Sequence, residues 1–141
     1  MKKIVSKLLS VFLFFLCIGC TVSENLQIHE SGHYDQKEDV ALYLHTYHKL
    51  PSNYITKQEA RKLGWESGSL SEIAEGMCIG GDYYGNYEGT LPEDKEYREC
   101  DINTLSSKTR GAERIVYSDD WDIYYSDEHY ETFELLYEGE E

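Results

Sequence analysis

The chain has 141 residues, which is enough for one domain built around one hydrophobic core. It carries 27 Asp and Glu residues against 13 Lys and Arg residues, and its formal net charge is −14. Because contacts to phosphate are made by Lys and Arg, this charge taken alone argues against a nucleic-acid ligand. Thirteen tyrosines favour a body rich in β-strands, with amphipathic aromatic faces.

The first 19 residues have the pattern of a signal peptide. Three lysines lie within the first seven residues, and the stretch 8–18 is almost wholly apolar but short for a membrane-spanning helix. It ends L-C-I-G-C, which is similar to the processing site of bacterial lipoproteins, although Cys17 stands where leucine is usual. We therefore expect export to the extracellular side. The protein is then either anchored to the membrane through a lipid on Cys20 or simply secreted.

Residues 20–37 are polar and show no hydrophobic periodicity, which predicts a flexible tether. The remainder of the chain shows no internal repeat and no second boundary in composition. We expect it to form a single domain over residues 38–141.

A first helix is expected over residues 38–49, where apolar residues at positions 40, 44 and 47 recur at helical spacing. Leu50 and Pro51 end it, because a proline disfavours the helical conformation of the residue before it. His48 falls in the last turn, where a cation interacts favourably with the helix dipole. We interpret His48 as structural.

A capping box formed by Thr56 and Glu59 predicts the start of a second helix. Lys57 is then its first residue, close to backbone amides that favour anions. A second capping box at residues 69–72 predicts a short third helix that ends at Gly76.

The second half of the chain consists of short aromatic or β-branched runs separated by turn residues, which is typical of strands. Helices followed by strands indicate an α+β fold, with N-terminal helices packed on a C-terminal antiparallel sheet. The expected strands are residues 77–84, 97–103, 114–118, 121–125 and 132–137.

Five ionisable residues form a set that could act on a phosphate ester. Glu99 can remove a proton from a hydroxyl, and His129 can protonate a leaving group. Lys57, Arg110 and Arg114 can stabilise the additional negative charge of a transition state. Each of these residues alone has a more ordinary explanation, such as an ion pair at the edge of the core, so the set needs support from its neighbours.

That support comes from four sequence words, which occur in this order and read H-T-Y-H-K-L-P-S-N-Y-I-T-K at 45–57, I-G-G-D at 79–82, A-E-R-I-V-Y-S-D-D-W at 112–121 and D-E-H-Y-E-T-F at 127–133. They resemble the barnase-like family of secreted bacterial guanyl-preferring ribonucleases. The resemblance covers about residues 40–133, nearly the whole expected mature chain. It implies the microbial ribonuclease fold.

The resemblance also implies a reaction. RNA carries its own nucleophile, the 2′-hydroxyl, so the family needs a base, an acid and a phosphate clamp, and we expect no metal or other cofactor. Glu99 would be the general base and His129 the general acid, with Lys57, Arg110 and Arg114 as the clamp. The products implied are a 2′,3′-cyclic phosphate and a 5′-hydroxyl, and the ring is hydrolysed afterwards.

Recognition of the guanine base is expected in the loop after residue 83. The carboxylate of Glu88 can accept both donors of the Watson–Crick edge of guanine, and backbone amides of the Gly85-Asn86 turn can bind its carbonyl. Tyr84 and Tyr130 can stack on the base. The family usually has arginine immediately before this glutamate, whereas this chain has Tyr87.

The resemblance suggests partners as well. We expect a monomer that acts on single-stranded RNA. A barstar-like inhibitor protein would protect the producing cell, although the loss of a cation at Tyr87 puts its fit in question. Contact with a membrane is expected only through the N-terminal lipid anchor.

Cys78 and Cys100 lie on the two expected strands that flank the base-recognition loop. Antiparallel pairing of these strands would bring the cysteines opposite each other, and an exported protein allows a disulfide. The alternative is a pair of small buried strand residues.

Two other functions compete with an active ribonuclease. One is a module of the same fold that binds RNA or protein with weakened catalysis, which the acidic charge and Tyr87 would fit. The other is a glycan hydrolase that uses two carboxylates among Asp82, Glu88 and Glu99. The arginines near Glu99 disfavour the second.

Overall fold

The computed structural model describes residues 27–140, and the structural statements below refer to that part of the chain. The predicted signal peptide, residues 1–19, and the predicted lipidation site at Cys20 lie outside it. No helix within residues 27–140 has both the length and the apolar character needed to cross a bilayer.

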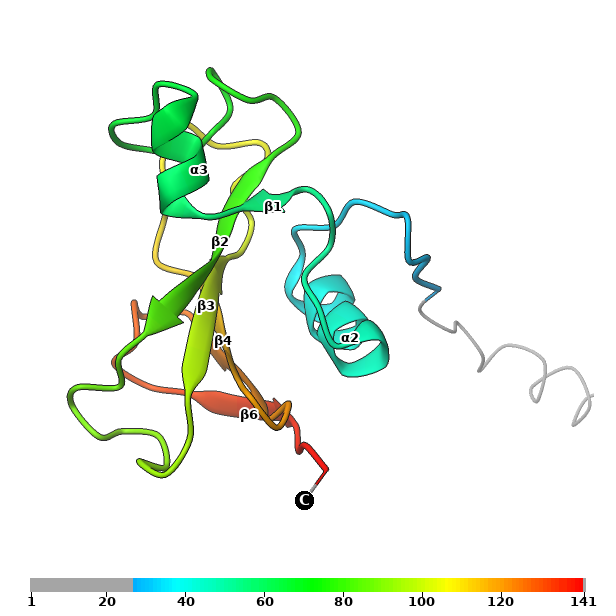
Figure 1. Cartoon of the computed structure of the whole chain (residues 1–141), viewed down its shortest axis with the longest axis vertical. Coiled ribbons are helices and arrows are strands. Elements are labelled where there is room, and N and C mark those ends of the chain that lie inside the picture. The colour runs from blue at the N-terminus through cyan, green and yellow to red at the C-terminus, as the bar shows by residue number, and fades with distance from the viewer. Residues whose placement is uncertain (1–26, 141) are drawn as a thin grey trace, which may run out of the picture.

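A six-stranded sheet forms the body of the domain, and its strands lie side by side in the order of the sequence (Figure 1). The pairings from β2 to β6 are antiparallel, whereas β1 pairs with β2 in parallel. Parallel neighbours need a crossover connection, and here that connection contains α3. The strands are β1 (Tyr54–Ile55), β2 (Cys78–Tyr84), β3 (Tyr97–Asp101), β4 (Arg114–Ser118), β5 (Ile123–Ser126) and β6 (Glu134–Tyr137).

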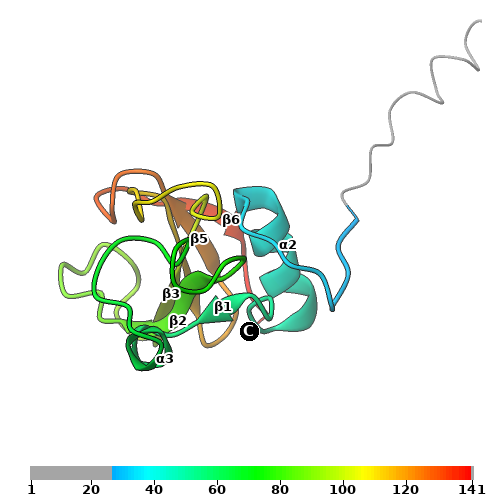
Figure 2. The ribbon, with the colours of Figure 1, turned by 90° about the horizontal axis from the view of Figure 1, so that it is seen from above.

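Two helices accompany the sheet at different places. α2 (Lys37–Tyr47) packs against β5 and β6, and α3 (Lys57–Lys62) lies beside β2, away from α2 (Figure 2). Val40 and Leu44 of α2 are fully buried against Ile115 and Ile123 of the sheet. The expected α+β fold class is therefore confirmed.

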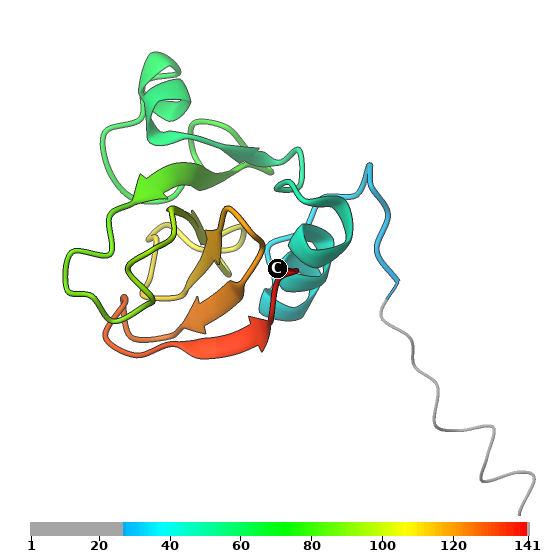
Figure 3. The same ribbon diagram turned by 60° about the horizontal axis from the view of Figure 1, so that its bottom comes forward.

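The other face of the sheet is covered by loops rather than by a helix. Loops 85–96 and 127–133 lie on the side away from α2 (Figure 3). They cover a second cluster that contains Leu91, Tyr97 and Val116. Side chains along a strand alternate between the two faces of the sheet. Glu99, two residues after Tyr97 on β3, therefore lies on the same loop-covered face as Tyr97.

Residues 29–36, here called the N-terminal strap, are bound to the domain. This differs from the expectation that residues 20–37 form a flexible tether. The buried side chain of Asp35 accepts a hydrogen bond from the amide of Leu105 at 3.0 Å, and its carbonyl accepts one from Asn103 at 2.9 Å. Tyr34 exchanges hydrogen bonds with the buried side chain of Asn53. Hydrogen-bonding groups of this segment thus have partners in the domain, and such partners cannot be predicted from amino-acid composition.

The first helix ends slightly earlier than predicted. His48 leaves the helix with φ of 53° while its amide still donates to the Leu44 carbonyl at 3.0 Å. Its ring stacks on Trp121 with centroids 4.6 Å apart. His48 thus joins the end of α2 to the β4–β5 turn.

Two local features differ from the prediction. The expected third helix is a series of turns: the Leu70 carbonyl accepts from the Ile73 and Ala74 amides and the Ala74 carbonyl accepts from the Met77 amide, without a continuous run of helical hydrogen bonds. The short strand β1 was not predicted. With Tyr54 and Ile55 alone it is too short to show the alternation by which strands are recognised.

The predicted disulfide is also wrong, since Cys78 and Cys100 are both free and buried. The register explains this: Gly80 is the residue opposite Cys100, whereas Cys78 pairs with Tyr54. A Cβ atom added to Gly80 would lie 2.6 Å from Cys100 Cβ. The two cysteines are offset along neighbouring strands, and each packs as a small core residue.

Candidate active site

Glu99 lies at the centre of the candidate site, on β3 between Asp82 of β2 and Val116 of β4. Its side chain is only 11% exposed. One carboxylate oxygen, Oε1, lies 3.4 Å from Lys57 Nζ, and the other, Oε2, accepts a hydrogen bond from the Tyr130 hydroxyl. A buried carboxylate with one cation and one neutral donor is well placed to exchange a proton with a ligand.

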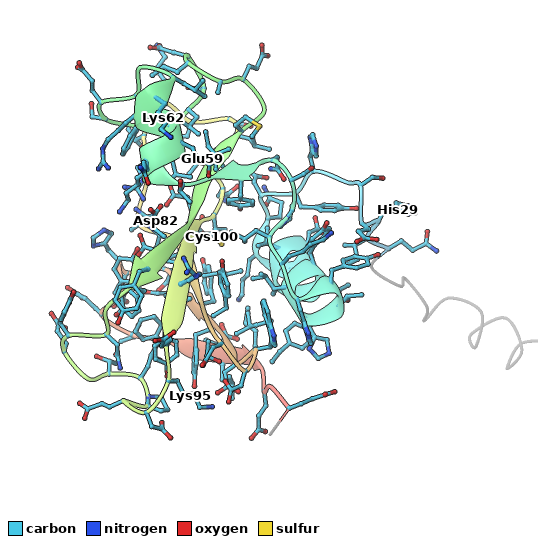
Figure 4. The ribbon with its side chains drawn as sticks, in the orientation of Figure 1. His29, Glu59, Lys62, Asp82, Lys95 and Cys100 are labelled. Atoms are coloured by element: carbon cyan, nitrogen blue, oxygen red, sulfur yellow. The ribbon has the colours of Figure 1, made fainter. Side chains whose placement is uncertain are left out.

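Lys57 reaches Glu99 because the start of α3 is fixed in two ways. Thr56 and Glu59 form the predicted capping box. The backbone amide of Lys57 also donates to Asp82 Oδ2 at 3.0 Å. Figure 4 shows Asp82 beside β2, below the turn of α3 that carries Glu59. Asp82 thus holds the helix against β2 so that the ammonium group lies over Glu99.

Asp101 binds both arginines of the expected phosphate clamp. Arg110 makes a bidentate pair with it, from Nε to Oδ2 and from Nη2 to Oδ1, each at 2.8 Å. Arg114 Nε lies 3.2 Å from Oδ1, but its N–H is not aligned with that oxygen and has no hydrogen-bond acceptor. Both guanidinium groups therefore converge on one buried carboxylate.

The two arginines differ in how far a ligand could reach them. Arg114 is 2% exposed, and its Nη1 donates to three backbone carbonyls, those of Arg110, Gly111 and Glu113. Arg110 retains 22% exposure of its side chain. Arg110 is thus the more accessible cation, while Arg114 ties the 110–113 loop to β4.

His129 lies in an exposed turn with an unusual backbone. His129 and Tyr130 have φ values of 53° and 74°, in the left-handed region that non-glycine residues seldom adopt. The turn is held by hydrogen bonds from the His129 amide to the Ala112 carbonyl at 3.0 Å and from the Tyr130 amide to Ser126 Oγ at 2.9 Å. Such strain persists only where the surroundings enforce it, and it often marks functional sites.

The loop that is expected to recognise the base is held in place by hydrogen bonds within it. The side chain of Asn86 accepts from the Leu91 amide at 3.1 Å and donates to the Leu91 carbonyl at 2.9 Å. The Gly89 amide donates to the Asn86 carbonyl at 3.0 Å. The exposed Glu88 is therefore presented on a fixed backbone.

An open cleft of about 380 Å³ joins this loop to the His129 turn. Tyr84 and Tyr130 were expected to stack on a base, but here they stack on each other, with ring centroids 4.9 Å apart. Burial, followed by the charge of Glu99, raises the pKa of Tyr130, so its hydroxyl stays protonated and donates to Glu99. The cleft is lined by Tyr84, Tyr87, Glu88, His129, Tyr130 and Glu131.

The structure thus brings the predicted residues to one face of the sheet. Three features of this face were not predicted: the Tyr130–Glu99 hydrogen bond, the ion pair between Asp101 and Arg110, and Glu131 at the rim of the cleft. Across the described residues, no group of His, Cys, Asp and Glu side chains has the arrangement needed to hold a metal ion.

The domain is thus an α+β domain that places a carboxylate, an imidazole and basic side chains on one face of its sheet. The chain belongs to the ribonuclease family, because the model of that family, described as ribonuclease, matches residues 37–137. This membership also decides against a glycan hydrolase.

Related proteins are also ribonucleases. A ribonuclease of Bacillus intermedius is 44% identical over 80% of this chain and 72% of its own length. A ribonuclease of Heyndrickxia coagulans is 50% identical over 68% of this chain and 91% of its own length. Guanyl-specific ribonuclease St of Saccharopolyspora erythraea is 40% identical over 39% of this chain and 56% of its own length. Among solved structures, ribonuclease Sa2 with mononucleotides matches at 26% identity and a TM-score of 0.35, over 62% of this chain and 85% of that one.

Proposed function

We propose that this ribonuclease is a guanyl-preferring endonuclease that cleaves single-stranded RNA by transesterification, with Glu99 as general base and His129 as general acid. The observation that carries the proposal is the buried Glu99 carboxylate beside Lys57 Nζ, on the sheet face from which the cleft with His129 opens. The proposal covers the base preference, the residue roles and the chemistry.

In the first step Glu99 accepts the proton of the 2′-hydroxyl, and the freed oxygen attacks the adjacent phosphorus. The bond from phosphorus to the 5′-oxygen breaks, and His129 in its protonated form donates a proton to that oxygen. In the second step the roles reverse. His129 takes a proton from water, the hydroxide opens the 2′,3′-cyclic phosphate, and Glu99 returns its proton to the 2′-oxygen. No proton or electron is left over at the end of the cycle.

Lys57 and Arg110 stabilise the charge that builds on the phosphate oxygens, because both are partly exposed on the Glu99 side. Arg114 acts mainly by holding the loop that carries Arg110, since its guanidinium is buried. Asp101 neutralises part of this positive charge and fixes its position.

Guanine is bound by Glu88 and by amides of the 85–89 loop, and the name of the guanyl-specific relative supports this preference. Tyr130 now covers both Tyr84 and Glu99, so the substrate has to displace its ring or stack on it. Without RNA, the rings of Tyr84 and Tyr130 stack on each other and keep the site compact. A bound nucleobase would stack on one of these rings in place of the other ring.

The decisive experiment is an RNA zymogram with Glu99→Gln and His129→Ala. Each variant removes a proton-transfer group, so cleavage should fall by roughly 10²–10⁴-fold. Glu96→Gln and His33→Ala change exposed residues of the same types away from the cleft, and they should leave cleavage intact. EDTA should have no effect, because the chemistry needs no metal.

Near-normal cleavage by His129→Ala would contradict the acid assignment, and loss of activity in EDTA would contradict the metal-independent mechanism. An inactive wild type that still binds RNA would favour the alternative, a binding module of this fold.

We also propose export through residues 1–19, with Cys20 as the point of a lipid anchor or as part of the secreted chain. Mass spectrometry of the mature N-terminus distinguishes a lipidated Cys20 from a plain one. An intact N-terminal segment on the mature protein would contradict export by cleavage.

A further inference from the structure

Most lysines and arginines of the described chain lie within 4.0 Å of a carboxylate. The exceptions are Arg61, Lys62 and Arg98. Arg98 precedes Glu99 on β3 and therefore lies on the opposite face of the sheet, where its Nη1 donates to the Gly81 carbonyl at 2.8 Å. Arg61 and Lys62 remain, both exposed at the end of α3. On a chain with a net charge of −14, two adjacent cations without such a partner call for an explanation.

The helix α3 places these two cations beside the candidate active site. Lys57, whose Nζ lies 3.4 Å from Glu99 Oε1, is the first residue of α3. Arg61 follows it by four residues, and residues at this spacing are neighbours on one face of a helix. Figure 4 shows Lys62 farther along the same helix, beyond Glu59. The positive charge that begins at Lys57 therefore continues along α3, away from Glu99.

The ring of Trp65 joins Arg61 to the phosphate clamp. Trp65 is 7% exposed, and its Nε1 donates to the Gly68 carbonyl at 2.8 Å, so the ring is held in place. Arg61 Cζ lies 5.6 Å from the ring centroid, and Arg110 Cζ lies 6.0 Å from it. Both guanidinium groups thus contact one ring. Arg61 is therefore a neighbour of Arg110, the more accessible arginine of the clamp.

The carboxylate of α3 that lies near these cations already has other partners. Glu59 accepts hydrogen bonds from the Thr56 amide at 3.1 Å and from the Thr56 hydroxyl at 2.9 Å. These bonds, and after them the charge of Lys62, lower the pKa of Glu59. Glu59 thus caps the helix, while the side chains of Arg61 and Lys62 extend into solvent. Exposed cations next to a phosphate clamp suit further phosphates, which they bind with release of counterions.

We propose that Arg61 and Lys62 form an additional phosphate subsite, which holds the backbone of single-stranded RNA beyond the scissile phosphate; this rests on the function proposed above. Lys57 and Arg110 act on the phosphate that is cleaved. Arg61 and Lys62 bind a phosphate farther along the strand, which a dinucleotide does not have. They are positioning residues for long RNA and take no part in breaking the bond.

Binding is tested with a single-stranded oligonucleotide whose one guanosine is 2′-deoxy and therefore cannot be cleaved. The variant Arg61→Gln with Lys62→Gln removes both charges, and glutamine keeps the helix propensity. Loss of two exposed charge contacts should raise Kd roughly 2- to 30-fold at about 0.15 M salt. Each phosphate contact adds about 0.7 to the salt slope of binding to a single strand, so the slope should become shallower by about 1.4.

Cleavage distinguishes this subsite from the residues that act on the scissile phosphate. With the cleavable form of the oligonucleotide, the double variant should raise KM and leave kcat close to that of the wild type. With guanylyl-3′,5′-adenosine, whose only phosphate is the scissile one, the loss in kcat/KM should be clearly smaller. Arg61→Lys with Lys62→Arg keeps both charges and should retain most of the affinity for the oligonucleotide.

The matched control is Lys37→Gln with Lys49→Gln. It removes the same charge from α2 and the turn that follows it, away from α3 (Figure 2). The control should weaken binding of the oligonucleotide clearly less than the α3 variant does. An equal loss in the control would overturn the inference, because the charge of the whole chain would then decide affinity.

Two other results would overturn the inference as well. One is an unchanged Kd and salt slope in the α3 variant. The other is an equal loss of kcat/KM for the dinucleotide and the oligonucleotide, since Arg61 and Lys62 would then act at the scissile phosphate. Failure of the proposed function differs from both: the wild type would cleave neither substrate, while binding of the uncleavable oligonucleotide would still report on the subsite.

Discussion

Asp101 determines how much positive charge the site can present. It is 2% exposed and is the only carboxylate within 4.0 Å of either guanidinium group in the described chain. A buried carboxylate between two cations is compensated only while all three are present. The same residue therefore serves stability and the geometry of Arg110.

Replacing Asp101 with asparagine should destabilise the fold. The buried Arg114 and the partly exposed Arg110 would both lose their counter-charge, and losing one partner of a buried pair costs about 3–5 kcal/mol. Urea unfolding followed by circular dichroism measures this loss. Asp119→Asn, an exposed carboxylate with no side-chain bond among the described residues, should change the free energy of unfolding by less than about 0.5 kcal/mol. A loss below 1 kcal/mol in Asp101→Asn would mean that water reaches this cluster.

At the scale of single residues, the sequence predicts candidate residues that the structure brings to one sheet face, but it does not predict the contacts between them. Glu99, Lys57 and His129 could be predicted from their neighbouring words and their chemistry. That Tyr130 donates to Glu99 depends on the left-handed backbone at Tyr130, and no local pattern indicates that conformation. Whether an arginine faces a ligand or a buried aspartate is likewise decided in three dimensions.

At the scale of elements, a helix or strand could be predicted with correct bounds where the residues flanking both of its ends indicate a turn. β4 has the predicted bounds, Arg114–Ser118, because Gly111 precedes it and an aspartate turn follows it. The helix predicted from the capping box at residues 69–72 did not form. Ser69 Oγ accepts from the Ser71 amide at 3.3 Å and also donates to the Ser107 carbonyl, but it does not accept from the Glu72 amide, as a capping box requires.

The pairing of β2 with β3 leads to a prediction for the cysteines. Burial raises the pKa of Cys78 to about 11, and it also raises the pKa of Cys100. A thiol with a raised folded-state pKa contributes stability that is complete below its unfolded value of about 9.0 and is lost as the pH rises. The free energy of unfolding should therefore fall between about pH 9 and pH 11.

Chemical unfolding at several pH values measures this trend, and Cys78→Ala should make it shallower. Alkylation with peptide mapping gives an independent check: Cys78 and Cys100 should be protected in the native protein and modified after denaturation. A peptide pair linked through these two cysteines would contradict the register described above.

At the scale of the whole molecule, the charge of the chain opposes the charge of its site. The net charge is −14, and ten acidic residues but no Lys or Arg follow Arg114. Two of them, Asp120 and Asp122, are paired with Lys95, while the cleft holds Glu131. RNA is thus attracted by Lys57 and Arg110 at short range and repelled by many carboxylates at longer range.

Salt should therefore affect long and short substrates differently. Screening acts most on exposed, distant charges, with a Debye length of about 30 Å at 0.01 M and about 8 Å at 0.15 M. We expect kcat/KM for long RNA to rise or stay level up to about physiological ionic strength and then to fall. A dinucleotide reaches less of the acidic surface and should show a smaller rise. A steep fall for long RNA from the lowest salt upward would place the acidic surface away from the path of the substrate.

The order of the strands has a consequence for how the chain reaches its native state. Each antiparallel pairing joins strands that are neighbours in the sequence, so the loops to be closed are short and the entropy lost in closing them is small. The strap is the opposite case, since Asp35 meets Leu105 across 70 residues. We expect the meander that carries Glu99, Arg110 and His129 to form early in folding. The strap then closes late and reversibly, so local opening would begin at the N-terminal edge of the domain, far along the chain from the residues of the cleft.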